Sequence, residues 1–270
     1  MRPRVMGVVN VTPDSFSDGG RLVDVQAAIR HALALVEQGA DILDIGGEST
    51  RPGAAPVSPA QEIDRVGPVI AGVRALWPGP ISIDTMKPQV ARAAVEAGAT
   101  LWNDVSALTF GPDSVSSAAD LGCPVVLMHM KGDPRTMQDA PTYDDVVAEV
   151  TDYLAQRAAV AEAQGVARAN IWLDPGIGFG KTLAHNLALT AGLGQVVALG
   201  YPVLYGASRK RMIQALDPAG ADPADRLGGS LALAIEAARN GASALRVHDV
   251  RQTVQALAVL DALQAGTDPA

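Results

Sequence analysis

The stretch "DILDIGGESTRPG", residues 41–53, begins with the apolar run of a buried strand and ends in a polar turn. Glycines flank the chemically capable side chains at that end, which are Glu48, Ser49, Thr50 and Arg51. Polar groups beside a core are costly unless they are hydrogen-bonded or bind something. The stretch therefore raises the question of what its turn binds, and the rest of the chain repeats the same pattern.

Composition limits the possible functions. The chain has 270 residues, of which 48% are hydrophobic and 19% are charged, so it can bury a substantial core. We expect residues 1–270 to form a single domain. A net charge of −8 argues against nonspecific binding to nucleic acid or to an anionic membrane, because both are polyanions. Any anionic ligand then requires a local basic cluster.

Cysteine usage and the N-terminal residues indicate the compartment. Cys123 is the single cysteine, so the chain can form no internal disulfide, as is usual in a reducing environment. The apolar run Val5–Val9 is too short for a secretory signal or a membrane span. We expect a soluble, cytoplasmic protein.

Short apolar runs alternate with alanine-rich segments of helical periodicity, which is typical of a parallel sheet covered by helices. The eight predicted strands are Val5–Val11, Asp41–Gly46, Ile81–Thr85, Thr100–Val105, Pro124–Met130, Ile171–Asp174, Pro202–Ala207 and Ala244–Val250. Predicted helices include Asp24–Gln38, Pro59–Leu76, Pro88–Ala97, Tyr143–Gln164 and Leu227–Asn240. This pattern predicts an α/β fold of the (β/α)8 TIM-barrel type, whereas a doubly wound open sheet usually has about six strands.

Polar residues concentrate where the predicted strands end. In a TIM barrel the active site lies at the C-terminal ends of the strands, so this distribution predicts the active face. The groups at these ends are Asn10, "GGESTRPG", Asp84, Asn103, Met128, "DPGIGFGK", "SRKR" and "RVHD".

The segment "PGIGFGKT" resembles a phosphate-binding loop, but Pro175 stands where a Walker loop requires glycine. We expect instead a flexible loop that lets the backbone approach a ligand. "SRKR", residues 208–211, is basic at a helix start, where cations are unfavourable unless an anion also binds. With Arg51, Arg246 and His248 this segment forms a positively charged site in a protein of negative net charge. The expected ligand is phosphate or diphosphate.

The carboxylates and amide at three strand ends indicate a second kind of ligand. Asp84, Asn103 and Asp174 together offer the acceptors and donors that a nitrogen-rich heterocycle requires. The alternative for Asp84 is purely structural, a hydrogen bond to the backbone near Asn103. Ser208 and Cys123 have no obvious activating partner in the sequence, so we expect no protein nucleophile.

Taken together, these motifs resemble the dihydropteroate synthase family of pterin-binding TIM barrels. The matching segments span the chain in colinear order: "MGVVNVTPDSFSDGG" (6–20), "DILDIGGESTRPGA" (41–54), "ISIDTMKPQVARAAVEAGA" (81–99), "NDV" (103–105), "VVLMHMKGDPRTMQ" (125–138), "DPGIGFGK" (174–181), "GASRKRMI" (206–213) and "RVHDV" (246–250). Tyr205 and Ile177 depart from the family pattern.

The resemblance implies a transferase of folate biosynthesis that condenses 6-hydroxymethyl-7,8-dihydropterin diphosphate with para-aminobenzoate to 7,8-dihydropteroate and diphosphate. By similarity, catalysis depends on Asp84, Lys210 and Arg246, and the pterin binds to Asp84, Asn103, Met128, Asp174 and Lys210. The resemblance implies that diphosphate binds to Asn10, Thr50, Arg51, Arg246 and His248. It implies that aminobenzoate binds to Phe16, Thr50, Arg51, Pro52 and Ser208.

The resemblance also implies that Asn10 binds Mg²⁺ and that sulfonamide drugs target the enzyme. We hypothesise an SN1-like displacement, because the carbon left by diphosphate is conjugated to the electron-rich dihydropterin. The family further suggests a homodimer, for which Leu227–Asn240 and Thr253–Leu263 are candidate surfaces. Two alternatives remain: a methyltetrahydrofolate–corrinoid methyltransferase, which needs no basic cluster, and a non-catalytic pterin-binding paralogue.

Overall fold

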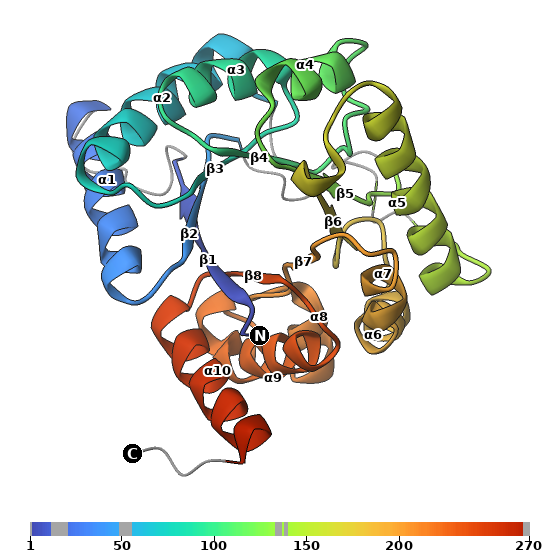
Figure 1. The fold of residues 1–270 in the computed structure, drawn as a ribbon. Helices are drawn as coiled ribbons and strands as arrows, with labels where there is room; N and C mark the ends of the chain where they lie inside the picture. Colours follow the sequence, from blue (N-terminus) through green and yellow to red (C-terminus); the bar gives the residue numbers. More distant parts are fainter. Residues whose placement is uncertain (1, 12–20, 49–55, 133–136, 138–139, 267–270) are drawn as a thin grey trace.

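The structure is a computed structural model that describes residues 2–11, 21–48, 56–132, 137 and 140–266. Eight parallel strands form a central barrel, and helices surround it (Figure 1). The strands are β1 (Arg4–Asn10), β2 (Ile42–Gly46), β3 (Ile81–Asp84), β4 (Leu101–Asp104), β5 (Val125–Met128), β6 (Ile171–Asp174), β7 (Leu204–Tyr205) and β8 (Ala244–Val247).

The strand order follows the chain around the barrel. Paired neighbours run β6-β5-β4-β3-β2-β1-β8-β7, and every pairing is parallel. An isolated bridge between Leu173 and Val203 joins β6 to the segment that leads into β7. The TIM-barrel prediction is therefore confirmed, and the doubly wound open sheet is excluded.

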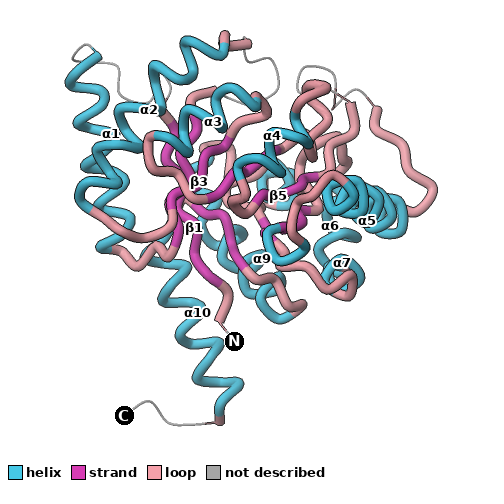
Figure 2. Tube along the Cα trace, turned by 45° about the horizontal axis from the view of Figure 1, so that its top comes forward, coloured by secondary structure: helices cyan, strands magenta, loops and turns pink. Residues whose placement is uncertain are grey.

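The outer ring contains more helices than the sequence predicted. They are α1 (Arg21–Glu37), α2 (Pro59–Leu76), α3 (Pro88–Glu96), α4 (Ser114–Leu121), α5 (Val146–Ala163), α6 (Leu183–Ala191), α7 (Leu193–Val197), α8 (Arg211–Leu216), α9 (Leu227–Arg239) and α10 (Val250–Ala265). Short 3-10 turns occupy Arg168–Asn170 and Pro223–Arg226. Figure 2 shows α10 extending away from the strands towards the C-terminus.

Strand alternation separates an apolar layer from a polar one inside the barrel. Side chains two residues apart share a face of a strand, so each inward position has its inward neighbour one layer higher. The buried apolar cluster of Met6, Ile42, Leu101, Val126, Trp172, Leu204 and Ala244 forms the lower layer. Two residues further along the chain come Val8, Asp44, Asn103, Met128, Asp174, Gly206 and Arg246, of which four are polar or charged. The fold therefore collects these groups at the C-terminal end of the barrel.

Helix α2 is the first helix after β2 and begins at Pro59. Ser58 is its N-cap and accepts the Gln61 N–H, while the Gln61 side chain accepts the Ser58 N–H, which makes a capping box. Pro59 occupies the first helical position, where its missing N–H costs nothing. This start fixes where the chain re-enters the helical ring after the turn.

Candidate active site at the barrel mouth

A cavity lies at the C-terminal ends of the strands. Including its part open to solvent it holds about 470 Å³, a size suited to a small-molecule ligand. The residues that line it are Asp84, Asn103, Val105, Met128, Asp174, Phe179, Gly206, Ser208, Lys210, Arg246 and His248.

Most of the predicted site residues meet in this cavity. All five residues assigned to the pterin line it, together with Ser208, Arg246 and His248. Asn10 ends β1 at the same face of the barrel but is not among the described residues that line the cavity. The remaining predicted residues, which are Phe16, Thr50, Arg51 and Pro52, lie outside the described part of the chain.

Arg246 is held by two carboxylates in the middle of the barrel. Its Nε donates to Asp44 Oδ2 at 2.6 Å, and its Nη2 donates to Asp84 Oδ2 at 2.7 Å. Asp44 is fully buried and also accepts from Asn103 Nδ2 at 3.3 Å. The hydrogen bond that the structure shows for the Asp84 side chain is this one to Arg246 on β8, rather than one to the backbone near Asn103.

Asp44 was missed by the sequence analysis, although it connects Arg246 to Asn103. A signal existed, since an acidic residue within an apolar parallel strand requires a buried partner. Its Oδ1 atom is buried with no hydrogen-bond partner among the described residues, so the carboxylate retains acceptor capacity. A ligand N–H is one group that could satisfy an acceptor of this kind.

Burial changes the acidity of the groups in the cavity. It raises the pKa of Asp84, against the opposing effect of Arg246, and it raises the pKa of Asp174. Burial opposes the charge of Arg246, but Asp44 and Asp84 raise the pKa of the guanidinium above its usual value. The arrangement keeps one permanent positive charge between two carboxyl groups, of which Asp84 lines the cavity and Asp44 is fully buried.

Lys210 extends across the cavity towards the loop after β6. Its ammonium group donates to the Ile177 carbonyl and lies 4.5 Å from the centre of the Phe179 ring. Burial lowers the pKa of Lys210 to about 8, despite the nearby Asp174 carboxylate. Lys210 therefore joins the acidic and aromatic walls of the same pocket.

Ser208 has a partner that the sequence did not reveal. Its Oγ lies 3.1 Å from His248 Nδ1 and accepts the His248 backbone N–H at 3.2 Å. The expectation that Ser208 has no activating partner was therefore wrong. Residues 208 and 248 follow different strands, and only the adjacency of β7 and β8 brings them together.

The glycine-rich loop after β6 packs on protein rather than opening towards solvent. Gly176 has a φ of +67°, and a Cβ built there would lie 1.9 Å from the His129 carbonyl oxygen. Gly180 has a φ of +63°, and its Cβ would lie 2.3 Å from the Lys131 carbonyl oxygen. The glycines permit close approach, as predicted, but the backbone that they approach is that of the preceding loop.

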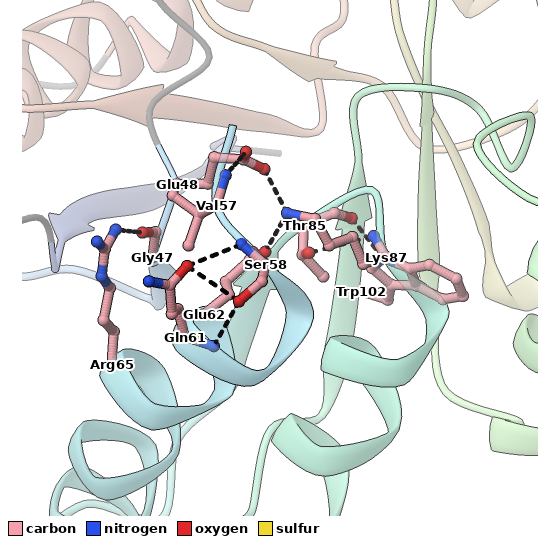
Figure 3. A network of polar contacts seen from close by, with 10 residues as sticks. All are labelled: Gly47, Glu48, Val57, Ser58, Gln61, Glu62, Arg65, Thr85, Lys87 and Trp102. Atoms are coloured by element: carbon pink, nitrogen blue, oxygen red, sulfur yellow. Dashed lines mark hydrogen bonds and ion pairs between the residues drawn. The ribbon is translucent and has the colours of Figure 1, made fainter. Parts of the chain in front are cut away.

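Three charged residues form a second buried group beside the cavity, which we call the Lys87 cluster (Figure 3). Lys87 Nζ lies 2.6 Å from both Glu48 Oε2 and Glu62 Oε2. Glu48 Oε1 accepts the Val57 N–H at 2.8 Å, so one carboxylate connects the two sides of the turn that follows β2. The question of what the turn after β2 binds therefore has a partial answer, because Glu48 of "GGESTRPG" binds Lys87 and the Val57 N–H within the protein.

Tyr205 does not narrow the cavity. Its side chain is buried and its hydroxyl lies 2.8 Å from Thr190 Oγ1. This residue therefore packs among the helices, and the cavity is lined at this strand by Gly206.

The donor set is compatible with magnesium only if the ligand supplies most of the oxygens. Asn10 offers a hard amide oxygen at the end of β1. In the described part of the chain no cluster of three or more His, Cys, Asp or Glu side chains could hold a metal. Mg²⁺ commonly binds with few protein ligands and several substrate phosphate oxygens, so Asn10 fits a shared site of that kind.

Comparison with known proteins decides the family. The family model described as pterin binding enzyme matches residues 6–248. The chain belongs to the pterin-binding enzyme family. Dihydropteroate synthase of Escherichia coli (strain K12) is 49% identical over 260 residues, which cover 96% of this chain and 91% of that protein.

Solved structures of pterin-binding enzymes share the fold. Dihydropteroate synthase of Xanthomonas albilineans with 4-aminobenzoic acid is 54% identical, with a TM-score of 0.91 over 98% of this chain and 94% of that one. The Yersinia pestis enzyme in a sulfonamide drug complex is 44% identical, with a TM-score of 0.92 over 98% and 95% of the two chains. None of the described helices combines the length and apolarity needed to cross a membrane.

Proposed function

We propose that the chain condenses 6-hydroxymethyl-7,8-dihydropterin diphosphate with para-aminobenzoate to give 7,8-dihydropteroate and diphosphate. The observation that carries this proposal is the single cavity that combines Asp84, Asn103 and Asp174 with the cations Lys210 and Arg246. Close relatives are dihydropteroate synthases over nearly their whole length, which supports the same reaction here.

The acidic wall suits the pterin ring. Asn103 donates and accepts through its amide, while Asp84 and Asp174 accept N–H groups of the heterocycle. Gly176 N–H donates to Asp174 Oδ1 at 2.7 Å, which orients this carboxylate in the pocket. Met128 and Phe179 supply apolar surface for the ring faces. The pterin then lies in the polar layer of the barrel, above the apolar one.

The cations bind the diphosphate in this proposal. Arg246 and His248 are near enough to line one cavity, and Asn10 would hold Mg²⁺ together with diphosphate oxygens. Bound Mg²⁺ supplies charge neutralisation for the leaving group. Thr50 and Arg51, which lie outside the described residues, are further diphosphate ligands by family resemblance.

The displacement breaks the bond between the pterin methylene carbon and the diphosphate oxygen, and both bonding electrons leave with the diphosphate. The aminobenzoate nitrogen then forms the new bond to this carbon and loses a proton. In this proposal the carboxylate of Asp84, which lines the cavity, stabilises a carbocation conjugated to the dihydropterin. Ser208 is assigned to aminobenzoate, with Phe16 and Pro52, rather than to nucleophilic attack.

Replacing Asp84 tests the cation-stabilising role. Asp84→Ala should lower kcat by about 100-fold or more, the cost of losing one preorganised electrostatic group, and should leave the KM for aminobenzoate nearly unchanged. Steady-state kinetics at saturating pterin diphosphate measures both constants. Equal effects on kcat and on the aminobenzoate KM would contradict the role, and Asp84→Asn separates charge from shape.

Product formation separates this function from its alternatives. Purified protein should release one diphosphate for each dihydropteroate when pterin diphosphate, Mg²⁺ and aminobenzoate are present. Binding of pterin diphosphate without product would favour a non-catalytic paralogue. The basic groups Lys210 and Arg246 argue against a methyltransferase that binds no diphosphate.

The dimer is a further part of this proposal. Val259 and Leu263 on α10 are 57% and 72% exposed, which supports an interface on this helix within the predicted segment Thr253–Leu263. Light scattering of the purified protein measures the mass, and a monomer at micromolar concentration would contradict the dimer. A cytoplasmic location stays a prediction of the sequence.

A further inference from the structure

A buried lysine joins the two loops that form one wall of the cavity. Lys181 Nζ lies 2.9 Å from the carbonyl oxygens of Gly176 and Phe179 in the loop after β6. It lies 2.9 Å from His129 Nδ1 and 3.2 Å from the His129 carbonyl in the loop after β5. We call Lys181 with His129, Gly176 and Phe179 the Lys181 cluster.

The contacts of this cluster go mainly to backbone acceptors rather than to carboxylates. Lys181 is 3% exposed, so water does not replace its hydrogen bonds. Burial keeps the His129 imidazole neutral by lowering its pKa to about 3, and an unprotonated ring nitrogen can accept a hydrogen bond from the Lys181 side chain. Leaving buried carbonyls without donors would be costly, so the lysine favours this one arrangement of the two loops.

The surrounding contacts allow the two loops little freedom to shift. Gly176 and Gly180 have no room for a Cβ against the backbone of His129 and Lys131. The Tyr143 hydroxyl donates to the Gly180 carbonyl at 2.8 Å. A displacement of either loop therefore moves the other with it.

Three side chains of the cavity belong to this pair of loops. Met128 ends β5, Asp174 ends β6, and Phe179 carries one of the two β6-loop carbonyls that Lys181 binds. Lys181 itself is not among the residues that line the cavity. Its ammonium group is therefore placed to act on the pocket through the backbone, without touching a ligand.

We propose that Lys181 is a positioning residue that sets the pterin-binding geometry of Met128, Asp174 and Phe179 by fixing the loops after β5 and β6 to each other. The proposal rests on the proposed function, because it takes the cavity to be the pterin pocket. It predicts that loss of Lys181 weakens pterin binding without removing any side chain that lines the cavity.

The test compares Lys181→Met and Lys181→Gln with the wild type. Titration calorimetry with 6-hydroxymethyl-7,8-dihydropterin diphosphate and Mg²⁺ gives the Kd. We expect the pterin Kd of Lys181→Met to rise about 10- to 100-fold, as for residues that orient a first layer of ligands. Lys181→Gln keeps a hydrogen-bond donor and should recover part of the affinity.

Lys131→Met is the matched control. Lys131 belongs to the same loop, but its side chain is 43% exposed and contacts Thr142 and the Tyr143 ring. This variant should retain the wild-type Kd for the pterin within about 3-fold, because the backbone contact at Lys131 does not need its side chain.

Each outcome separates this proposal from the proposed function. A folded Lys181→Met with wild-type pterin Kd, or a folded Lys181→Gln that recovers no affinity, would overturn the positioning role. Unfolding of both Lys181 variants, seen by circular dichroism, would assign Lys181 to folding alone and also overturn it. A wild type that binds the pterin but forms no dihydropteroate would overturn the proposed function, while the Kd comparison would still decide the role of Lys181.

Discussion

Two buried lysines stand at the mouth of this barrel in opposite electrostatic surroundings. Lys87, 5% exposed, lies between the carboxylates of Glu48 and Glu62. Lys181, 3% exposed, lies among backbone carbonyls and a neutral imidazole. Burial opposes the charge in both cases, yet the pKa of Lys87 is raised by its two carboxylates, whereas the pKa of Lys181 is lowered to about 7.

The difference separates charge compensation from backbone positioning. In the Lys87 cluster the ammonium group neutralises buried carboxylates, so removing it leaves uncompensated charge. In the Lys181 cluster it satisfies neutral carbonyls, so removing it leaves polar groups without donors but creates no buried charge. The first lysine should therefore matter more for stability, and the second more for the shape of the pocket.

The largest expected effect is on the stability of Lys87→Met. Glu62 is fully buried, so loss of its partner should lower the free energy of unfolding by about 3–5 kcal/mol. Urea unfolding followed by circular dichroism measures this change. The double variant Lys87→Met/Glu62→Gln should recover part of the loss, because it also removes a buried charge. If Lys87→Met lowered the free energy of unfolding by less than about 1 kcal/mol, charge compensation by Lys87 would not distinguish it from Lys181.

A smaller loss is expected for Lys181→Met. Its carbonyl partners are neutral, so the free energy of unfolding should fall by about 1–3 kcal/mol, the cost of leaving buried acceptors unsatisfied. The same urea titration serves for both lysines. If Lys181→Met were the less stable of the two variants, backbone acceptors would outweigh charge compensation here, and the contrast between the clusters would be reversed.

The last expected effect is a change of stability with pH rather than a difference at one pH. With a pKa lowered from its ordinary 10.5 to about 7, folded Lys181 releases a proton that the unfolded chain keeps. The wild type should therefore gain stability over Lys181→Met from pH 7 to pH 9, by up to about 1.4 kcal/mol per pH unit. Lys87 has a raised pKa and stays protonated in both states, so its stabilisation persists over this range and falls only above pH 10.5.

Unfolding of the three proteins at pH 7, 8 and 9 measures these slopes. If the free energy of unfolding changed with pH by the same slope in both variants, relative to the wild type, Lys181 would keep its proton over this range. The carbonyl oxygens around Lys181 favour that charged form.

The sequence predicted the barrel well because each inner strand is a continuous apolar run. It overestimated β7, predicted as Pro202–Ala207 and observed as Leu204–Tyr205, because apolarity continues beyond the paired residues. It did not predict α4, whose sequence "SVSSAADL" contains few large apolar residues to mark a helical face. Hydrophobic patterning thus predicts which segments are buried, whereas the residues at which a strand begins and ends depend on its pairing with neighbouring strands.

The predicted cavity residues share one property, which is their position at a strand end. Asp44 lies within a strand, so the argument from strand ends passed over it. Lys181 was missed for another reason: its partners are backbone carbonyls, which every residue carries and no side-chain pattern encodes. The pairing of Ser208 with His248 depends on two strands meeting in space, which the spacing of 40 residues does not reveal.

The closure between β6 and β7 has a consequence for the substrate range of the enzyme. Along this seam the described residues show one isolated bridge, Leu173 with Val203, and one backbone bond, from Leu173 N to Pro202 O at 2.9 Å. Asp174 lies on one side of the seam, and Ser208 and Lys210 lie on the other. Because few backbone pairings hold this seam, we expect the barrel to widen there more easily than at its other strand pairs, and the Kd of pterin analogues with bulkier ring substituents measures whether the seam accommodates them.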